Sequence, residues 1–76
     1  MLDPPLIYDH PYGGMVIEHR LSAADIERLF GPGALSGTMM PTCHIWLPIS
    51  ISKKLEQRLR RHELAHCKGW PKDHPR

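Results

Sequence analysis

The residues of this chain that are best suited to chemistry lie near its C-terminus, in the segment RLRRHELAHCKGWPKDHPR. His62 and His66 stand four positions apart, and Glu63 directly follows the first of them. Histidines at positions i and i+4 of a helix present two imidazoles to one point, where they can bind zinc. A glutamate beside them can act as a general base on zinc-polarised water and later pass the proton to a leaving amine. The spacing therefore indicates a zinc site that still needs a third protein ligand.

A helix must hold these two histidines on one side, and the sequence predicts such a helix over residues 52–68. Ser52 is a suitable N-cap residue, and Gly69, with a proline two positions beyond it, is a typical stop signal. The chain should then turn back over residues 69–75. This turn is where a third ligand can come from.

The same helix carries an apolar stripe that leads to the site. At 100° per residue, Leu55, Leu59, His62 and His66 fall within about 60° of one another. The two imidazoles therefore continue the apolar stripe. They should point toward the body of the protein.

The front of the chain predicts the elements that this helix packs against. Residues 1–14 are rich in Pro and Gly and should be mostly loop. Residues 15–21 (MVIEHRL) are typical of a short strand, and Ser22 can cap a short helix that ends at Gly31. Residues 43–52 (CHIWLPISIS) are typical of an apolar strand.

Pro48 lies within this last strand and favours an edge position for the strand, because proline cannot donate a hydrogen bond to a neighbouring strand. An edge strand before the helix could also bind a substrate backbone, although an ordinary core strand is the simpler interpretation. Together the elements predict one α+β domain over residues 1–76. A short strand layer packs on the C-terminal helix, with one additional short helix.

Composition limits the classes of function. The chain has 76 residues, 10 Lys and Arg against 8 Asp and Glu, and a net charge of +2, which by itself indicates neither nucleic acid nor an anionic membrane as a partner. No apolar segment approaches the roughly twenty residues of a membrane span. The N-terminus lacks the pattern of a signal peptide, so a cytoplasmic location is the default expectation.

The chain contains two cysteines, Cys43 and Cys67. Paired, they would join the last strand to the final turn of the long helix; unpaired, Cys67 could fill the core or lie beside the metal. Because nothing in the sequence indicates export, the unpaired state is the favoured expectation.

The segment HELAHCKGWPKDH resembles the zincin metallopeptidases, and more closely the metzincin-like branch, in which a glycine ends the active-site helix. It is also similar to small zincin-like proteins of bacterial genomes and mobile elements with an HE..HC.GW...H core. The resemblance covers the last third of the chain well. It implies a minimal zincin-like domain, zinc ligation by His62 and His66, a general base at Glu63 and a helix-ending turn at Gly69.

The third ligand departs from the common pattern of that family, which places His or Asp three residues after the glycine. Here that position is Lys72, whose ammonium group cannot bind a metal, and Asp73 and His74 follow it. His74 is the predicted ligand, because neutral imidazole binds zinc strongly and Asp73 would stay free to orient a histidine. Asp73 is the alternative third ligand, since carboxylates also bind catalytic zinc.

Other candidate residues have simpler interpretations. His10, His19, His44, Tyr8 and Tyr12 could supply an alternative ligand or stabilise an oxyanion, but each fits a surface or packing role better. None of them enters the predicted site.

The basic segment KKLEQRLRR supports a second class of function. A basic helix can lie against phosphate, which would suit a nucleic-acid-binding or regulatory module stabilised by zinc and without catalytic activity. A solvated helix face is favoured instead, because the aromatic residues that would stack on bases are few and lie elsewhere. Structural zinc also normally has four protein ligands.

The prediction is therefore zinc-dependent peptide-bond hydrolysis, with Glu63 as the general base and Zn²⁺ as the cofactor. The expected partner is a peptide or protein substrate. Because a chain this short has little material for two cleft walls, a protein partner could complete the cleft.

Overall fold

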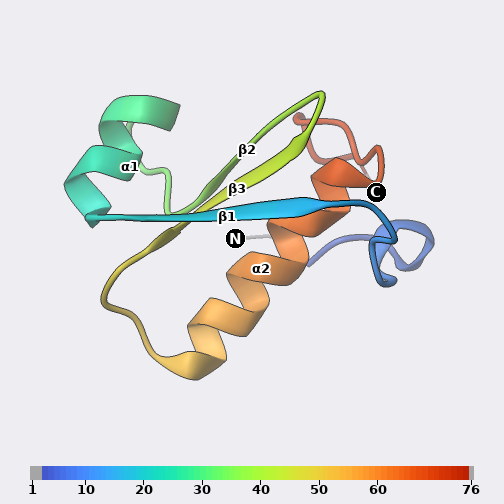
Figure 1. Cartoon of the computed structure of the whole chain (residues 1–76), viewed down its shortest axis with the longest axis horizontal. Coiled ribbons are helices and arrows are strands. Elements are labelled where there is room, and N and C mark those ends of the chain that lie inside the picture. The colour runs from blue at the N-terminus through green and yellow to red at the C-terminus, as the bar shows by residue number, and fades with distance from the viewer. Residues whose placement is uncertain (1–2, 76) are drawn as a thin grey trace.

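The computed structural model describes residues 3–75, and these form a small α+β domain, which confirms the predicted fold class (Figure 1). The predicted arrangement of a strand layer on the C-terminal helix, with one further short helix, is also present. In chain order the elements are the 3₁₀ turn η1 (Leu6–Tyr8), β1 (Val16–Leu21), α1 (Ala23–Phe30), β2 (Gly37–Met39), β3 (Cys43–Pro48) and α2 (Lys53–Cys67).

The three strands form one mixed sheet in the order β1-β3-β2. β1 runs parallel to β3, and β2 runs antiparallel to it. β3 is therefore the central strand, and the prediction that Pro48 marks an edge strand is wrong. Pro48 is the last residue of β3, where a missing N–H group interrupts no bond inside the ladder, and the next N–H, of Ile49, donates to the Leu21 carbonyl at 2.9 Å. The strand also ends there and does not continue to Ser52.

One face of the sheet packs on α2, and this contact is the core of the domain. Cys43, Ile45 and Leu47 alternate along β3, so that they share one face, and all three are buried with Leu59 of α2. α1 lies on the other side of the sheet (Figure 1). The sheet is therefore positioned between the two helices.

The contact between α1 and the sheet explains why a residue without a side chain suits position 37. The ring of Phe30 meets Trp46 of β3 edge to face, with ring centroids 5.5 Å apart. A Cβ atom at Gly37 would lie 2.2 Å from a carbon of that ring. Any side chain at the start of β2 would therefore force the Phe30 ring to shift.

Both helices begin at the predicted N-caps. The Ser22 hydroxyl accepts a hydrogen bond from the N–H of Asp25, and the Ser52 hydroxyl accepts one from the N–H of Leu55, each at 3.2 Å. α2 ends one residue before the predicted boundary, at Cys67, and Gly69 follows with a φ of 107°. The stop signal at Gly69 is confirmed, because this left-handed conformation favours glycine.

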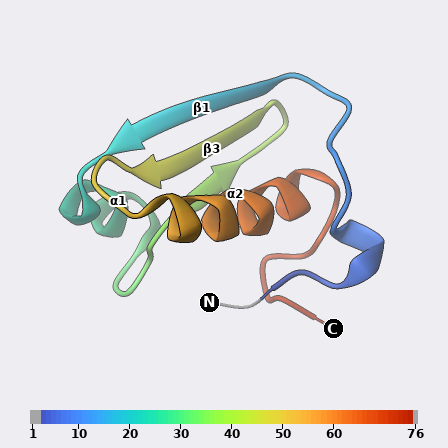
Figure 2. The same ribbon diagram turned by 90° about the horizontal axis from the view of Figure 1, so that it is seen from below.

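The N-terminal segment is mostly loop, as predicted, and lies beside the C-terminal end of α2 (Figure 2). Tyr12 packs against the core, and Asp9 forms an ion pair with Arg61 of α2. These contacts bring the front of the chain next to the predicted site.

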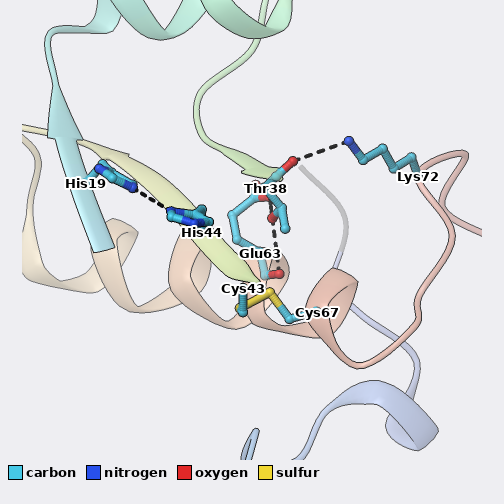
Figure 3. The surroundings of a disulfide bond; sticks show 7 residues. All are labelled: His19, Thr38, Cys43, His44, Glu63, Cys67 and Lys72. Carbon is cyan, nitrogen blue, oxygen red and sulfur yellow. Dashed lines mark hydrogen bonds between the residues drawn. A yellow bond between two sulfur atoms is a disulfide. The ribbon is translucent and has the colours of Figure 1, made fainter. Parts of the chain in front are cut away.

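Cys43 and Cys67 form a disulfide, so the expectation of free thiols is wrong (Figure 3). The bond joins the first residue of β3 to the last residue of α2, across a sequence separation of 24 residues. The paired state was the less favoured alternative, because whether the two sulfur atoms meet depends on how β3 lies against α2. Both sulfur-bearing residues are buried in the core.

Reduction of this disulfide should destabilise the fold. Closing a loop of this length lowers the entropy of the unfolded chain, which is worth about 3 kcal/mol. Urea unfolding with and without a reductant should show that difference in the free energy of unfolding. A Cys43→Ala, Cys67→Ala double variant should show the lower stability and no response to the reductant. Two titratable thiols in the untreated native protein would contradict the pairing.

Candidate metal centre

Three histidines converge at the C-terminal end of α2. His62 and His66 lie on the last turns of the helix, and His74 comes from the turn that follows it. Their Nε2 atoms are separated by 3.0 Å (His62 to His74), 3.2 Å (His66 to His74) and 3.4 Å (His62 to His66). Tetrahedral zinc, about 2.0–2.1 Å from each ligand, would separate ligand nitrogens by about 3.3–3.4 Å. The three separations fit one metal ion bound by three imidazoles.

The turn after α2 delivers His74 because Trp70 fixes its path. The indole of Trp70 is buried, and its N–H donates to the Pro75 carbonyl at 2.7 Å. The N–H of His74 donates to the Pro71 carbonyl at 3.0 Å, which closes a tight turn. His74 has a φ of 58°, a left-handed conformation that is uncommon for a residue with a side chain. The turn therefore imposes an unusual backbone conformation on the residue that completes the cluster.

The hydrogen bonds of His66 prepare its ring for a metal. Its Nδ1 atom lies 2.8 Å from the carbonyl oxygen of Trp70, and its ring stacks on the Trp70 indole. A carbonyl can only accept a hydrogen bond, so Nδ1 must carry the proton. In the neutral ring the lone pair is then on Nε2, which is the atom that faces the other two histidines.

The environment of His74 favours the form that binds metals. Burial, followed by the nearby charge of His66, lowers the pKa of the His74 imidazole from its ordinary value. A lower pKa keeps the ring neutral over a wider pH range. Neutral imidazole is the form that can donate a lone pair to a metal.

Glu63 lies next to the cluster and is held by two hydroxyl groups. Its side chain is 4% exposed, and its two carboxylate oxygens accept hydrogen bonds from the hydroxyls of Ser36 and Thr38. Thr38 belongs to β2 and Ser36 directly precedes that strand; the Thr38 contact is visible in Figure 3. Sequence reasoning missed both residues, because they lie in a Gly-rich segment that resembles a flexible connection. Only the tertiary fold brings them to Glu63.

A cavity of about 390 Å³ opens over this group. His62, Glu63, His66 and His74 all line it, so the structure brings four predicted site residues to one wall. The remaining lining residues come from the end of α1, the following loop, β2, the middle of α2 and the C-terminal turn: Phe30, Gly33, Ala34, Leu35, Ser36, Gly37, Thr38, Leu59 and Lys72. The lining of the cavity therefore includes apolar side chains as well as polar and nitrogen-bearing ones.

The structure separates the other candidates from the cluster. Asp73 is exposed and is not part of the histidine group, whereas His74 is. The Nε2 atom of His19 on β1 lies 2.9 Å from the Nδ1 atom of His44 on β3, a contact drawn in Figure 3, and neither residue belongs to the histidine group. His10 is exposed and contacts the Pro11 carbonyl.

The basic residues of α2 are largely neutralised by acidic partners. Arg60 pairs with Glu18 of β1 and with Glu56 of α2 itself. Arg58 pairs with Asp3, and Arg61 pairs with Asp9 of the N-terminal segment. These ion pairs link α2 to β1 and to the N-terminal segment.

Comparison of the chain with protein-family models, with curated proteins and with solved structures finds no match. Among residues 3–75, no helix is both long enough and apolar enough to cross a membrane.

The identity of the third ligand can be tested by substitution. His74→Ala should weaken zinc affinity on the order of a hundredfold or more, because it removes a direct ligand, whereas Asp73→Ala should change it little. Competition with a chromogenic chelator would measure both affinities. The reverse order, or an equal loss in a His10→Ala, His19→Ala or His44→Ala variant, would contradict the assignment.

The hydroxyl of Thr38 should contribute to stability through Glu63. Thr38→Val keeps the shape of the side chain but leaves a buried carboxylate with one fewer donor, which should cost about 2 kcal/mol. Thr38→Ser, which keeps a hydroxyl, is the matched control and should lose less. Chemical unfolding would measure both variants, and equal stability of Thr38→Val and the wild type would contradict the role given to this contact.

Proposed function

We propose that this protein is a zinc-dependent peptide hydrolase. The observation that carries the proposal is the approach of three Nε2 atoms to within 3.4 Å of one another, beside a buried glutamate and facing one cavity. Three protein ligands leave a fourth position open, which is typical of catalytic zinc and not of structural zinc. A cavity is needed at that position for a substrate to enter.

Zinc is the metal that this ligand set favours. Three imidazoles suit zinc, copper, nickel or iron, whereas calcium and magnesium prefer oxygen ligands. The separations between the three Nε2 atoms are close to those of a tetrahedral ion, and zinc adopts that geometry readily. Copper(II) and nickel(II) favour tetragonal arrangements instead.

The roles of the side chains follow from their positions. His62, His66 and His74 would hold the ion, which supplies Lewis-acid activation of water and of a peptide carbonyl. Glu63 would accept a proton from the attacking water and donate it to the leaving amine. A carboxylate has about four lone-pair sites, so the hydroxyls of Ser36 and Thr38 hold its orientation and leave capacity for that proton.

β2 is the strand best placed to bind a substrate backbone. β3 was considered for this role, with an ordinary core strand as the simpler interpretation, and it has a neighbour on each side and no free edge. Within the described sheet, β2 pairs with β3 alone, and it carries Thr38 beside Glu63. An extended peptide could add to its open edge and pass over the metal site.

Glu63→Gln should separate catalysis from metal binding. The amide keeps the size of the side chain and can still bond to both hydroxyls, so zinc content and fold should be retained. Cleavage of a peptide library by the zinc-loaded protein should fall by about a hundredfold or more, because the general base is lost. Glu56→Gln makes the same chemical change on the same helix outside the cavity and should leave the rate unchanged. Full activity in Glu63→Gln would rule out this mechanism.

A further inference from the structure

Lys72 is the feature of the cavity that metal binding leaves unexplained. It occurs in the turn after α2, two residues before His74. Among the described residues that line the cavity, it is the one Lys or Arg. A positive side chain therefore borders the same space as the three histidines.

The ammonium group of Lys72 retains capacity to bind another group. Its Nζ donates to the carbonyl oxygen of Thr38 at 3.3 Å, and this contact is drawn in Figure 3. Within residues 3–75, no Asp or Glu oxygen lies within 4.0 Å of it. An ammonium group has three donors, so one long contact to a neutral carbonyl leaves two of them available.

The arginines, unlike Lys72, have anionic partners. Every arginine from residue 3 to residue 75 forms an ion pair with Asp or Glu. Lys72 is the cation that faces the cavity and has no anionic partner in the described chain. Glu63, the acidic residue of the cavity lining, is already bonded to Ser36 and Thr38.

We propose that Lys72 binds a carboxylate of the ligand that occupies this cavity. Its contact with Thr38 holds the ammonium group at β2, the strand proposed above to receive the substrate backbone. The apolar residues of the lining, which include Phe30, Leu35 and Leu59, suit an apolar side chain of the same ligand. The preferred ligand is thus a peptide with a free carboxylate next to an apolar residue. This inference rests on the proposed function for its choice of a peptide.

The carboxylate can come from a C-terminus or from an acidic side chain, and small probes separate these sources. N-acetyl-leucine carries the terminal group, N-acetyl-leucinamide is its neutral counterpart, and the α-amide of N-acetyl-glutamate carries the side-chain group. Titration calorimetry on the zinc-loaded wild-type protein would measure their affinities. At least one acidic probe should bind about tenfold more tightly than the neutral amide, the scale of a hydrogen bond between charged groups.

Zinc also binds carboxylates. Variants of Lys72 therefore separate the contribution of its ammonium group to the binding of the acidic probe from that of the metal. Lys72→Met should remove the preference for the acidic probe, and Lys72→Arg should retain most of it. Lys54→Met is the matched control, since Lys54 is exposed on the first turn of α2 and outside the cavity lining. It should behave like the wild type. Zinc content, measured for each variant, should not change.

Three results would overturn the proposal. The acidic and neutral probes could bind equally, including no detectable binding of either; the preference could persist in Lys72→Met; or Lys54→Met could reduce it as much. Because these are binding measurements, they do not depend on turnover. A Lys72-dependent preference in a protein that cleaves no peptide would contradict the proposed function and leave the carboxylate site standing.

Discussion

The convergence of three imidazole nitrogens requires that the chain reverse direction directly after α2. Two of the rings are placed by helical spacing alone, but the third depends on the conformation of a short turn. Gly69 permits the change of direction, and the buried indole of Trp70 holds the turn against the end of the helix. The carbonyl of Trp70 also orients the ring of His66. One aromatic residue therefore positions His74 and prepares His66 at the same time.

The disulfide acts at the same end of α2 as the candidate metal centre. Cys67 directly follows His66, and its bond to Cys43 fixes this last turn to the central strand. A chain of 76 residues buries a modest core, so a covalent link and a metal are physically reasonable ways to hold the end of α2 that carries the histidines in place. The sequence left both states of the two cysteines open and favoured the unpaired one, since a disulfide requires a specific distance between two backbones that only the fold decides.

Local signals in the sequence predicted the local structure well. Ser52 and Gly69 mark the two ends of α2, because helix capping and left-handed turns depend on a few neighbouring residues. Long-range features were less accessible. Pro48 suggested an edge strand, but its effect depends on its position within the ladder, which only the pairing of three strands decides. Ser36 and Thr38 carried no recognisable signal, because their contact with the glutamate of the site spans the whole fold.

A resident zinc ion is tested most directly by elemental analysis and thermal unfolding of protein purified without chelators. About one zinc ion per chain is expected, and removal of the metal by a chelator should lower the melting temperature, because an ion that binds only the native state stabilises it. Restoring zinc should restore the melting temperature. Protein that holds no metal as purified, and whose melting temperature does not change when zinc is added, would contradict the assignment of the histidine cluster.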